Sequence, residues 1–292
     1  MYGLVVRVLG RVKYTLPVTF RGVSRTPLVA MLALAGCDAD GQLDPPTCEP
    51  PILIGHRGTP NYRPENTMPA FDWAMASGGH GVEIDVQRTL DGHLVAMHDT
   101  SIARTTNGGD RRVSELGLEE LQALDAGGWF HPDYAGTRVP TLHEIVDTLD
   151  ANYEAPLYVF DMKYASMIEP TAAFIEERGL GERGMLAVRS IEEVERVCAT
   201  PNAPTAILFL SSFSQIPDHR PACLEIMRLP GGTQYELENV QKVTSRGYHA
   251  LVGGWKIHWG YTRYSIADNI KDVVPWLEDQ IPPECIEQII GD

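Results

Sequence analysis

Basic residues are scarce in this sequence. Its 292 residues include 24 lysines and arginines against 39 aspartates and glutamates, and the formal net charge is −15. A protein that binds nucleic acid through its phosphates needs basic stripes, so we expect no nucleic-acid partner. Any phosphate that the protein handles must instead be met by a few placed cations or by a metal ion.

A long apolar run is also lacking. The apolar stretch before Cys37 is PLVAMLALAG, residues 27–36, which is far below the roughly 20 residues that span a bilayer. Five basic residues and no acid precede it, and this order is typical of a secretory signal over residues 1–36. The adjoining LAGC resembles the bacterial lipobox, which implies a lipid on Cys37.

We therefore expect an exported bacterial lipoprotein, anchored to the membrane through this lipid and facing the periplasm or the exterior. The alternative is a cytosolic chain with a chance apolar stretch. The long basic region leaves the true start codon open. Residues 37–50 are polar and rich in proline, which indicates a tether.

Residues 51–292 show no internal repeat and fit one domain. Short apolar runs alternate there with helix-like stretches, which indicates a parallel sheet covered on both faces. Eight strands over about 240 residues fit a TIM (β/α)8 barrel, with a doubly wound open sheet as the alternative. The predicted strands cover residues 52–55, 82–88, 157–163, 185–188, 206–210, 224–229, 250–255 and 288–290, the predicted helices residues 68–77, 142–150, 171–178 and 191–199, and an insertion after the second strand residues 99–140.

One stretch breaks the alternation of strands and helices. It reads EIDVQRTLDGHLVAMHD, and its Asp91-Gly92 between two alternating runs is a strong hairpin signal. With these two residues as the turn, Asp85 lies opposite His98, and opposed residues share a face. Glu83 shares that face because it lies two residues from Asp85 on the same strand.

Acidic residues lie near the ends of two predicted strands. Glu83 and Asp85 repel each other unless a cation lies between them, and their hard oxygens suit Ca²⁺ or Mg²⁺. Asp161 is a third candidate ligand, because barrel active sites lie at the carboxyl ends of strands. Lys163 would offer a cation to a phosphate. The alternatives are solvated acids on an exposed strand face and a surface ion pair.

Two histidines are the candidates for proton transfer. His56 follows the first predicted strand and His98 ends the hairpin, and imidazole titrates near neutral pH. A lone histidine is more often structural. Arg57 offers a planar fork that suits phosphate oxygens.

Several motifs occur in an order that resembles the glycerophosphodiester phosphodiesterase family. They are HRG, PENT, the hairpin stretch above, RTTNG and VPTLHEIV. The resemblance implies a TIM barrel with an insertion after its second strand. It also implies hydrolysis of glycerophosphodiesters to glycerol 3-phosphate and an alcohol with a divalent cation. The residues that match the family's roles are His56 and His98 as catalytic histidines, Arg57 as phosphate ligand, Glu83, Asp85 and Asp161 as metal ligands, Lys163 as the adjacent lysine, and Glu65 and Asn66 as a supporting loop.

The sequence departs from the family pattern in places that concern the substrate. Asp161 stands where the family usually has glutamate, and its Asp-x-Lys pattern resembles sphingomyelinase D-type phospholipases, which cleave lysophospholipids and sphingomyelin on the same barrel. Arg189-Ser190 replaces a frequent Ser-Phe pair, and the usual closing helix is not recognised after IIGD. The alternatives are therefore cleavage of a lysophospholipid or sphingolipid, or a lipoprotein that only binds a ligand.

Four cysteines follow Cys37, and four cysteines allow three pairings. We predict a bridge from Cys48 to Cys285, because each precedes a predicted terminal strand of a closed barrel, where the two strands are neighbours. Cys198 and Cys223 would form the second pair. A free Cys48 on a mobile tether is the alternative.

Overall fold

The structure is a computed structural model that describes residues 4–8, 12–16, 48, 50–231, 236–253, 262–268, 270–278 and 285. Cys37 and the predicted strand at residues 288–290 lie outside this part of the chain.

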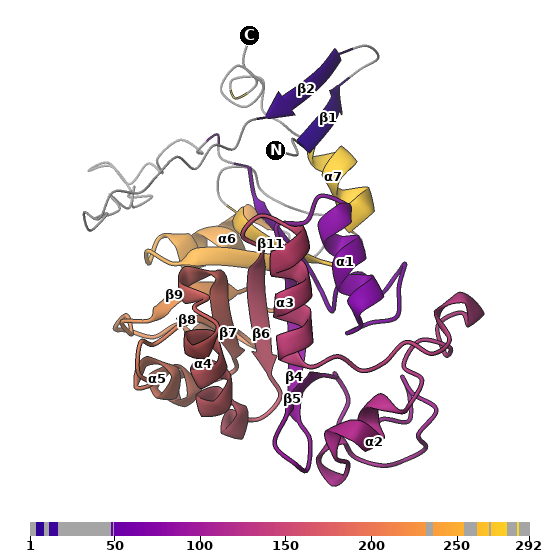
Figure 1. The fold of residues 1–292 in the computed structure, drawn as a ribbon. Coiled ribbons are helices and arrows are strands. Elements are labelled where there is room, and N and C mark those ends of the chain that lie inside the picture. The colour runs from indigo at the N-terminus through magenta and orange to yellow at the C-terminus, as the bar shows by residue number, and fades with distance from the viewer. Residues whose placement is uncertain are drawn as a thin grey trace, which may run out of the picture.

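Eight parallel strands form a closed barrel surrounded by helices, as predicted (Figure 1). Each strand pairs with the next, and the last pairs with the first. In chain order they are β3 (Ile52–Gly55), β4 (Gly81–Arg88), β6 (Leu157–Met162), β7 (Gly184–Val188), β8 (Thr205–Phe209), β9 (Leu224–Arg228), β10 (His249–Gly253) and β11 (Thr262–Ala267). A separate antiparallel pair is formed by β1 (Leu4–Val8) and β2 (Val12–Leu16).

The strand that closes the barrel is not the one predicted. β11 pairs with β3, so the eighth place in the barrel is filled before residues 288–290 are reached. Its sequence TRYSIA lacks a continuous apolar run. Tyr264 and Ile266 pack with the barrel interior, whereas the buried Ser265 stands between them. A search for apolar runs therefore passes over this strand.

Helices follow the barrel strands and cover the outside of the sheet (Figure 1). They are α1 (Met68–Ala76), α3 (Leu142–Asn152), α4 (Ile168–Glu177), α5 (Ile191–Cys198), α6 (Leu237–Thr244) and α7 (Ile270–Glu278), with the short α2 (Leu118–Gln122) in the insertion. Short 3₁₀ turns occur at Val113–Glu115, Pro132–Tyr134, Ala165–Met167, Gly181–Arg183 and Phe213–Gln215. Because α7 follows the last barrel strand, the expectation that a closing helix is missing is wrong. Within the described residues, no helix combines the length and the apolar character that a bilayer crossing requires.

The local sequence explains why α3 begins where it does. Thr141 and Glu144 form a capping box, in which each side chain accepts from the other's backbone N–H. Leu142, Ile145 and Leu149 then repeat at helical spacing and are fully buried against the sheet.

The barrel interior is a small apolar layer that contains Ile54, Val159, Ile207 and Leu251. Side chains alternate along a strand, so the residue two positions further on also points inward. At the carboxyl ends of the strands this inward position is polar in several cases. The alternation thus places charged groups directly above the apolar layer, at one end of the barrel.

The insertion begins with β5 (Leu94–Ala96), which pairs antiparallel with β4. The register differs by one residue from the predicted one: Val86 pairs with Ala96, so Asp85 lies opposite Met97 rather than His98. The turn is longer than a two-residue turn, because Thr89 N–H bonds to His93 O. Asp91 accepts hydrogen bonds from Thr89 and from Leu118 of the insertion, which favours this wider turn.

Two disulfides occur, Cys48–Cys285 and Cys198–Cys223, so the predicted pairing is confirmed. The reason given for it was partly wrong, since Cys285 follows α7 rather than preceding the last barrel strand. After a barrel strand, a helix leads the chain back toward the amino ends of the strands. Cys48 lies there as well, just before β3, and the two Cα atoms are 5.2 Å apart.

Candidate active site

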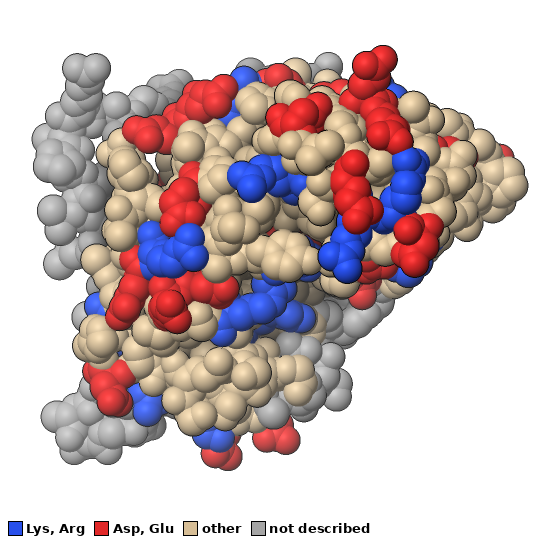
Figure 2. Space-filling model, turned by 90° about the horizontal axis from the view of Figure 1, so that it is seen from below, with Lys and Arg blue, Asp and Glu red and all other residues tan. Residues whose placement is uncertain are grey.

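Three buried carboxylates lie together at the carboxyl ends of β4 and β6. Glu83 and Asp85 are two residues apart on β4, and Asp161 on β6 pairs in register with Asp85. One oxygen of each lies within 4.8 Å of the others, and all three residues are buried. The predicted metal ligands are therefore brought together. Figure 2 views the molecule from this end, where acidic and basic side chains lie intermixed.

The donor set fits a hard divalent cation. Asp161 Oδ2 accepts from Lys163 at 2.6 Å and from Arg189 at 2.8 Å, whereas the buried Oδ1 has no hydrogen-bond partner. Burial, and then the charge of Asp85, raise the pKa of Glu83 to about 8. An unpartnered buried oxygen and a carboxylate that resists ionisation both indicate a site short of positive charge.

Lys163 bridges two of these carboxylates. Its Nζ lies 2.5 Å from Asp85 Oδ1 and 2.6 Å from Asp161 Oδ2, and its side chain is largely buried. Burial lowers the pKa of Lys163, but the two carboxylates outweigh this effect and the pKa is raised. The lysine therefore stays charged between the two carboxylates.

His56 follows β3 and is held by an aspartate that the sequence analysis missed. Its Nδ1 lies 2.6 Å from Asp268 Oδ1, and its Nε2 lies 4.0 Å from Glu83. Burial lowers the pKa of His56, but the charge of Glu83 and the bond with Asp268 outweigh burial and raise it. Asp268 follows β11 at the inward position after Ile266, and it escaped notice because that strand was not recognised.

Arg57 sits in a tight turn with φ of 48°, followed by Gly58 with φ of +80°. A Cβ on residue 58 would overlap the backbone of Ala70, so only glycine fits there. The turn aims Arg57 N–H at Glu83 Oε2, 2.8 Å away. The guanidinium lies 3.1 Å from Glu65 and 3.2 Å from Asp85. It thus stands beside the carboxylate cluster, as predicted for a phosphate ligand.

The PENT turn supports the cluster as predicted. Asn66 Nδ2 donates to Asp85 Oδ2 at 2.7 Å, and Asn66 Oδ1 accepts from Asp85 N–H at 3.2 Å. These two bonds fix the carboxylate and leave its Oδ1 toward Lys163. Asn66 has φ of 55°, a conformation that asparagine tolerates better than most residues.

His98 is also held through Nδ1, which lies 2.7 Å from Asp99 Oδ1. Arg104, from the RTTNG motif, contacts Asp99 at 2.5 Å and binds Glu65 through two nitrogens. Asp99 and Arg104 belong to two motifs of the sequence, the hairpin stretch and RTTNG, but the sequence alone assigned neither residue a role. They complete a chain of ion pairs from Arg57 to His98.

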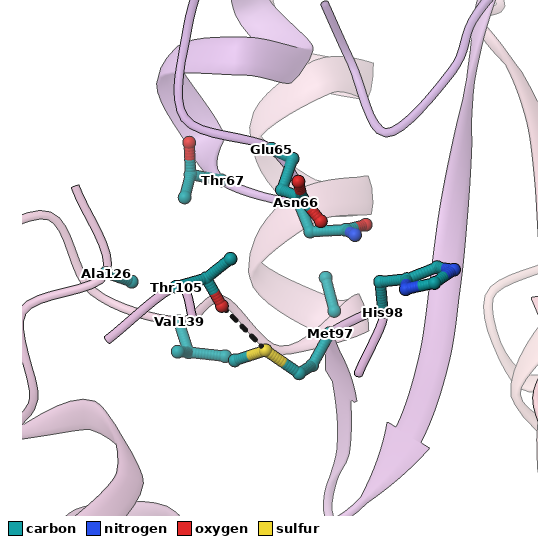
Figure 3. A pocket seen from close by; sticks show the side chains of 9 residues that line it. Glu65, Asn66, Thr67, Met97, His98, Thr105, Ala126 and Val139 are labelled. Atoms are coloured by element: carbon teal, nitrogen blue, oxygen red, sulfur yellow. Dashed lines mark hydrogen bonds between the residues drawn. The ribbon is translucent and has the colours of Figure 1, made fainter. Parts of the chain in front are cut away.

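Figure 3 shows where this network meets the insertion. The Met97 side chain points into the core of the insertion, where its sulfur accepts a hydrogen bond from the Thr105 hydroxyl at 3.2 Å. His98 points the other way, toward β4, and Asn66 lies on that side (Figure 3). Alternation along the backbone thus buries Met97 and delivers His98 to the mouth of the barrel.

The profile of the glycerophosphoryl diester phosphodiesterase family matches residues 56–213, more than half of the chain. A glycerophosphodiester phosphodiesterase of Caldanaerobacter subterraneus is 38% identical over 50% of this chain and 56% of its own length. One from Bacillus subtilis is 31% identical over 67% of this chain and 73% of its own length. The chain therefore spans little more than half the length of the first of these relatives.

Solved structures share the barrel. A glycerophosphodiester phosphodiesterase from Agrobacterium tumefaciens has a TM-score of 0.64 at 23% identity, over 77% of this chain and 100% of its own. A phosphodiesterase from Oleispira antarctica, solved with the product sn-glycerol-3-phosphate, has a TM-score of 0.64 at 22% identity, over 78% and 97%. At this identity the likeness establishes the fold.

Proposed function

Since the chain belongs to the glycerophosphoryl diester phosphodiesterase family, we propose that it hydrolyses glycerophosphodiesters to glycerol 3-phosphate and an alcohol. The observation that carries the proposal is the buried cluster of Glu83, Asp85 and Asp161 at the mouth of the barrel. One catalytic histidine candidate directly follows β3, and the other lies two residues after the end of β5. The names of the relatives and the product bound by the Oleispira enzyme support the same reaction.

We propose that Glu83, Asp85 and Asp161 hold one Ca²⁺ or Mg²⁺, as the unpartnered Asp161 Oδ1 indicates. When bound, such an ion supplies Lewis-acid polarisation of a phosphate oxygen. Asn66 keeps Asp85 in place. Arg57 and Lys163 offset the charge that develops on the phosphate during the reaction.

The two histidines divide the proton transfers between them. An ionised aspartate next to Nδ1 accepts a hydrogen bond, so Nδ1 carries the proton in both His56 and His98. Nε2 of the neutral ring is then free to accept a proton. One histidine takes the proton of the attacking hydroxyl, which belongs to water or to the substrate's own neighbouring group. The other, in its protonated form, donates to the leaving oxygen.

Release of glycerol 3-phosphate from glycerophosphocholine tests this proposal. We expect release with Ca²⁺ or Mg²⁺, its loss after treatment with EDTA, and its return when the metal is restored. Lysophosphatidylcholine and sphingomyelin should react poorly in the same assay. Rapid cleavage of either lipid without release from glycerophosphocholine would favour the phospholipase alternative, which the Asp161-x-Lys163 pattern suggests and the named relatives do not favour.

We also propose that the protein is exported and carries lipid on Cys37. The basic region, the apolar run and the lipobox-like LAGC support this. Two disulfides in the barrel add support, because disulfides persist in oxidising compartments outside the cytosol. Mass spectrometry of the mature N-terminus in the native host tests it, and an unmodified Cys37 would contradict it.

A further inference from the structure

The mouth of the barrel also carries side chains to which the proposed reaction assigns no role. The carboxylate cluster lies on β4 and β6, whereas β9 lies four strands from β4 in either direction around the eight-stranded barrel. From β6 toward that far side, the inward positions at the strand ends belong to Arg189 after β7, Phe209 on β8 and Arg228 on β9. Phe209 pairs in register with Arg228.

Phe209 holds the two arginines together. The guanidinium carbon of Arg228 lies 4.9 Å from the ring centroid of Phe209, and that of Arg189 lies 5.7 Å from it. Stacking on an aromatic ring fixes a guanidinium without using its N–H donors. Both arginines therefore keep donors available for a ligand.

The two arginines differ in how many of their guanidinium N–H groups have partners. Arg189 donates to Asp161 Oδ2 and to Met162 O, and 47% of its side chain remains exposed. Arg228 forms no direct ion pair within the described part of the chain, although its charge helps to lower the pKa of Asp268, and its Nε is buried without a hydrogen-bond partner. A buried donor without a partner costs free energy unless a ligand supplies an acceptor.

The positive charge of Arg189 and Arg228 decides which class of ligand can bind beside Phe209. A quaternary ammonium group such as choline is bound by open aromatic faces, and here two guanidinium groups already lie against the ring of Phe209. A carboxylate or a phosphate, in contrast, accepts charge-assisted hydrogen bonds from guanidinium forks. We infer that Arg189, Phe209 and Arg228 form a subsite for an anionic group on the alcohol part of the diester.

This inference rests on the proposed function, because the diester must be a substrate before its alcohol can be selected. It assigns the scissile phosphate to His56, Arg57 and the carboxylate cluster. The alternative is that Arg228 contacts the scissile phosphate itself. That role would affect every diester alike, whereas a subsite for the alcohol affects only those with an anionic head.

A matched pair of substrates separates these roles. Glycerophosphoserine and glycerophosphoethanolamine share the scissile phosphate and the amine and differ in one carboxylate. We expect kcat/KM of the wild-type protein to be about tenfold higher for the serine diester, the value of one charge-assisted hydrogen bond. Arg228→Gln should bring this ratio close to one. Arg228→Lys, which keeps the charge but loses the fork, should give an intermediate ratio.

Arg220→Gln is the matched control. Arg220 also lies over an aromatic ring, that of Tyr248 at 5.2 Å, but it precedes β9 at the opposite end of the barrel. Its replacement should leave the ratio unchanged. Thermal melting of each variant verifies folding, and Arg228→Lys carries the test if Arg228→Gln does not fold.

Three results would overturn the inference. A wild-type ratio near one would show that the carboxylate is not recognised, and a ratio that Arg228→Gln leaves intact would place the recognition elsewhere. An equal fall of kcat/KM for both diesters would assign Arg228 to the shared phosphate. In each of these cases the proposed function stands, because both diesters are hydrolysed. If neither is hydrolysed with Ca²⁺ or Mg²⁺ present, the proposed function fails as well.

Discussion

At the scale of single residues, each catalytic histidine candidate is paired with an aspartate through Nδ1. The partner of His56 is Asp268, 212 positions away, and the partner of His98 is its neighbour Asp99. An aspartate at Nδ1 orients the ring and fixes which nitrogen is free. The same local arrangement thus arises once from the closure of the barrel and once from a dipeptide.

Replacement of either histidine should remove most of the activity. We expect His56→Ala and His98→Ala each to lower kcat by about a hundredfold or more, because a positioned acid or base contributes that much to proton transfer. Thermal melting should change little, since both side chains lie at the open end of the barrel. His131→Ala is the control, because His131 is exposed in the insertion and pairs only with Asp133. Activity within a few fold of wild type would remove that histidine from the mechanism.

At the scale of elements, the insertion is fastened to the barrel through Arg104. This arginine binds Glu65 of the PENT turn and Asp99 beside His98. Glu65 in turn binds Arg57. Its position between these two acids makes Arg104 the link between Arg57, the proposed phosphate ligand, and His98, a proposed catalytic histidine.

Arg104→Met should therefore lower kcat by about tenfold, and its effect should be non-additive with that of Asp99→Asn, because both belong to one network. A double-mutant cycle on kcat/KM measures the coupling. Arg111→Met provides the control, since Arg111 pairs with Glu120 within the insertion. Strict additivity of Arg104→Met and Asp99→Asn would show that the network does not act on His98.

The hydrogen bond from Arg104, helped by that from His98, lowers the pKa of Asp99 to about 2. A carboxylate with a depressed pKa stabilises the folded state above its ordinary value near 3.9, and this contribution is lost as the pH falls toward 2. Because Asp99 is partly exposed, we expect about 1 kcal/mol. Urea unfolding of wild type and Asp99→Asn should differ by this amount at pH 6, and the difference should shrink below pH 4 and vanish as the pH falls through about 2. A constant difference would contradict the assignment.

At the scale of the whole molecule, a disulfide joins the segment before β3 to the segment after α7. Cys48 and Cys285 are 237 positions apart. In the chain-entropy account such a long loop gives a stabilisation on the order of 4–5 kcal/mol.

Cys48→Ala should accordingly lower the melting temperature by about 8–20 °C, because each of the 4–5 kcal/mol lost corresponds to about 2–4 °C in a domain of this size. Activity at room temperature should persist, because the bond lies at the end of the barrel away from the carboxylates. Peptide mapping without reductant should recover a Cys48–Cys285 peptide from protein made in an oxidising compartment. A Cys48 that alkylates without reduction would rule the bridge out.

The sequence by itself determined the barrel strands from β3 to β10, within two residues at each end, and the residues of the carboxylate cluster. Both can be predicted from short stretches of sequence, because an apolar run indicates a buried strand and a polar residue after it indicates the strand's open end. His56, Arg57, Asp161 and Lys163 stand in such places, whereas Glu83 and Asp85 alternate with apolar residues inside β4. Motif order tied all of them to one family.

Only the tertiary structure decided which strand closes the barrel, how the hairpin is registered and which groups meet across it. β11 carries no continuous apolar run, and its place depends on pairing with β3, more than 200 positions earlier. The closed barrel also creates the contacts of Asp268, Arg189 and Arg228, because the residues that each of them contacts come from other strands. A local pattern records whether a side chain is buried, whereas contacts between distant strands follow from the geometry of the closed sheet.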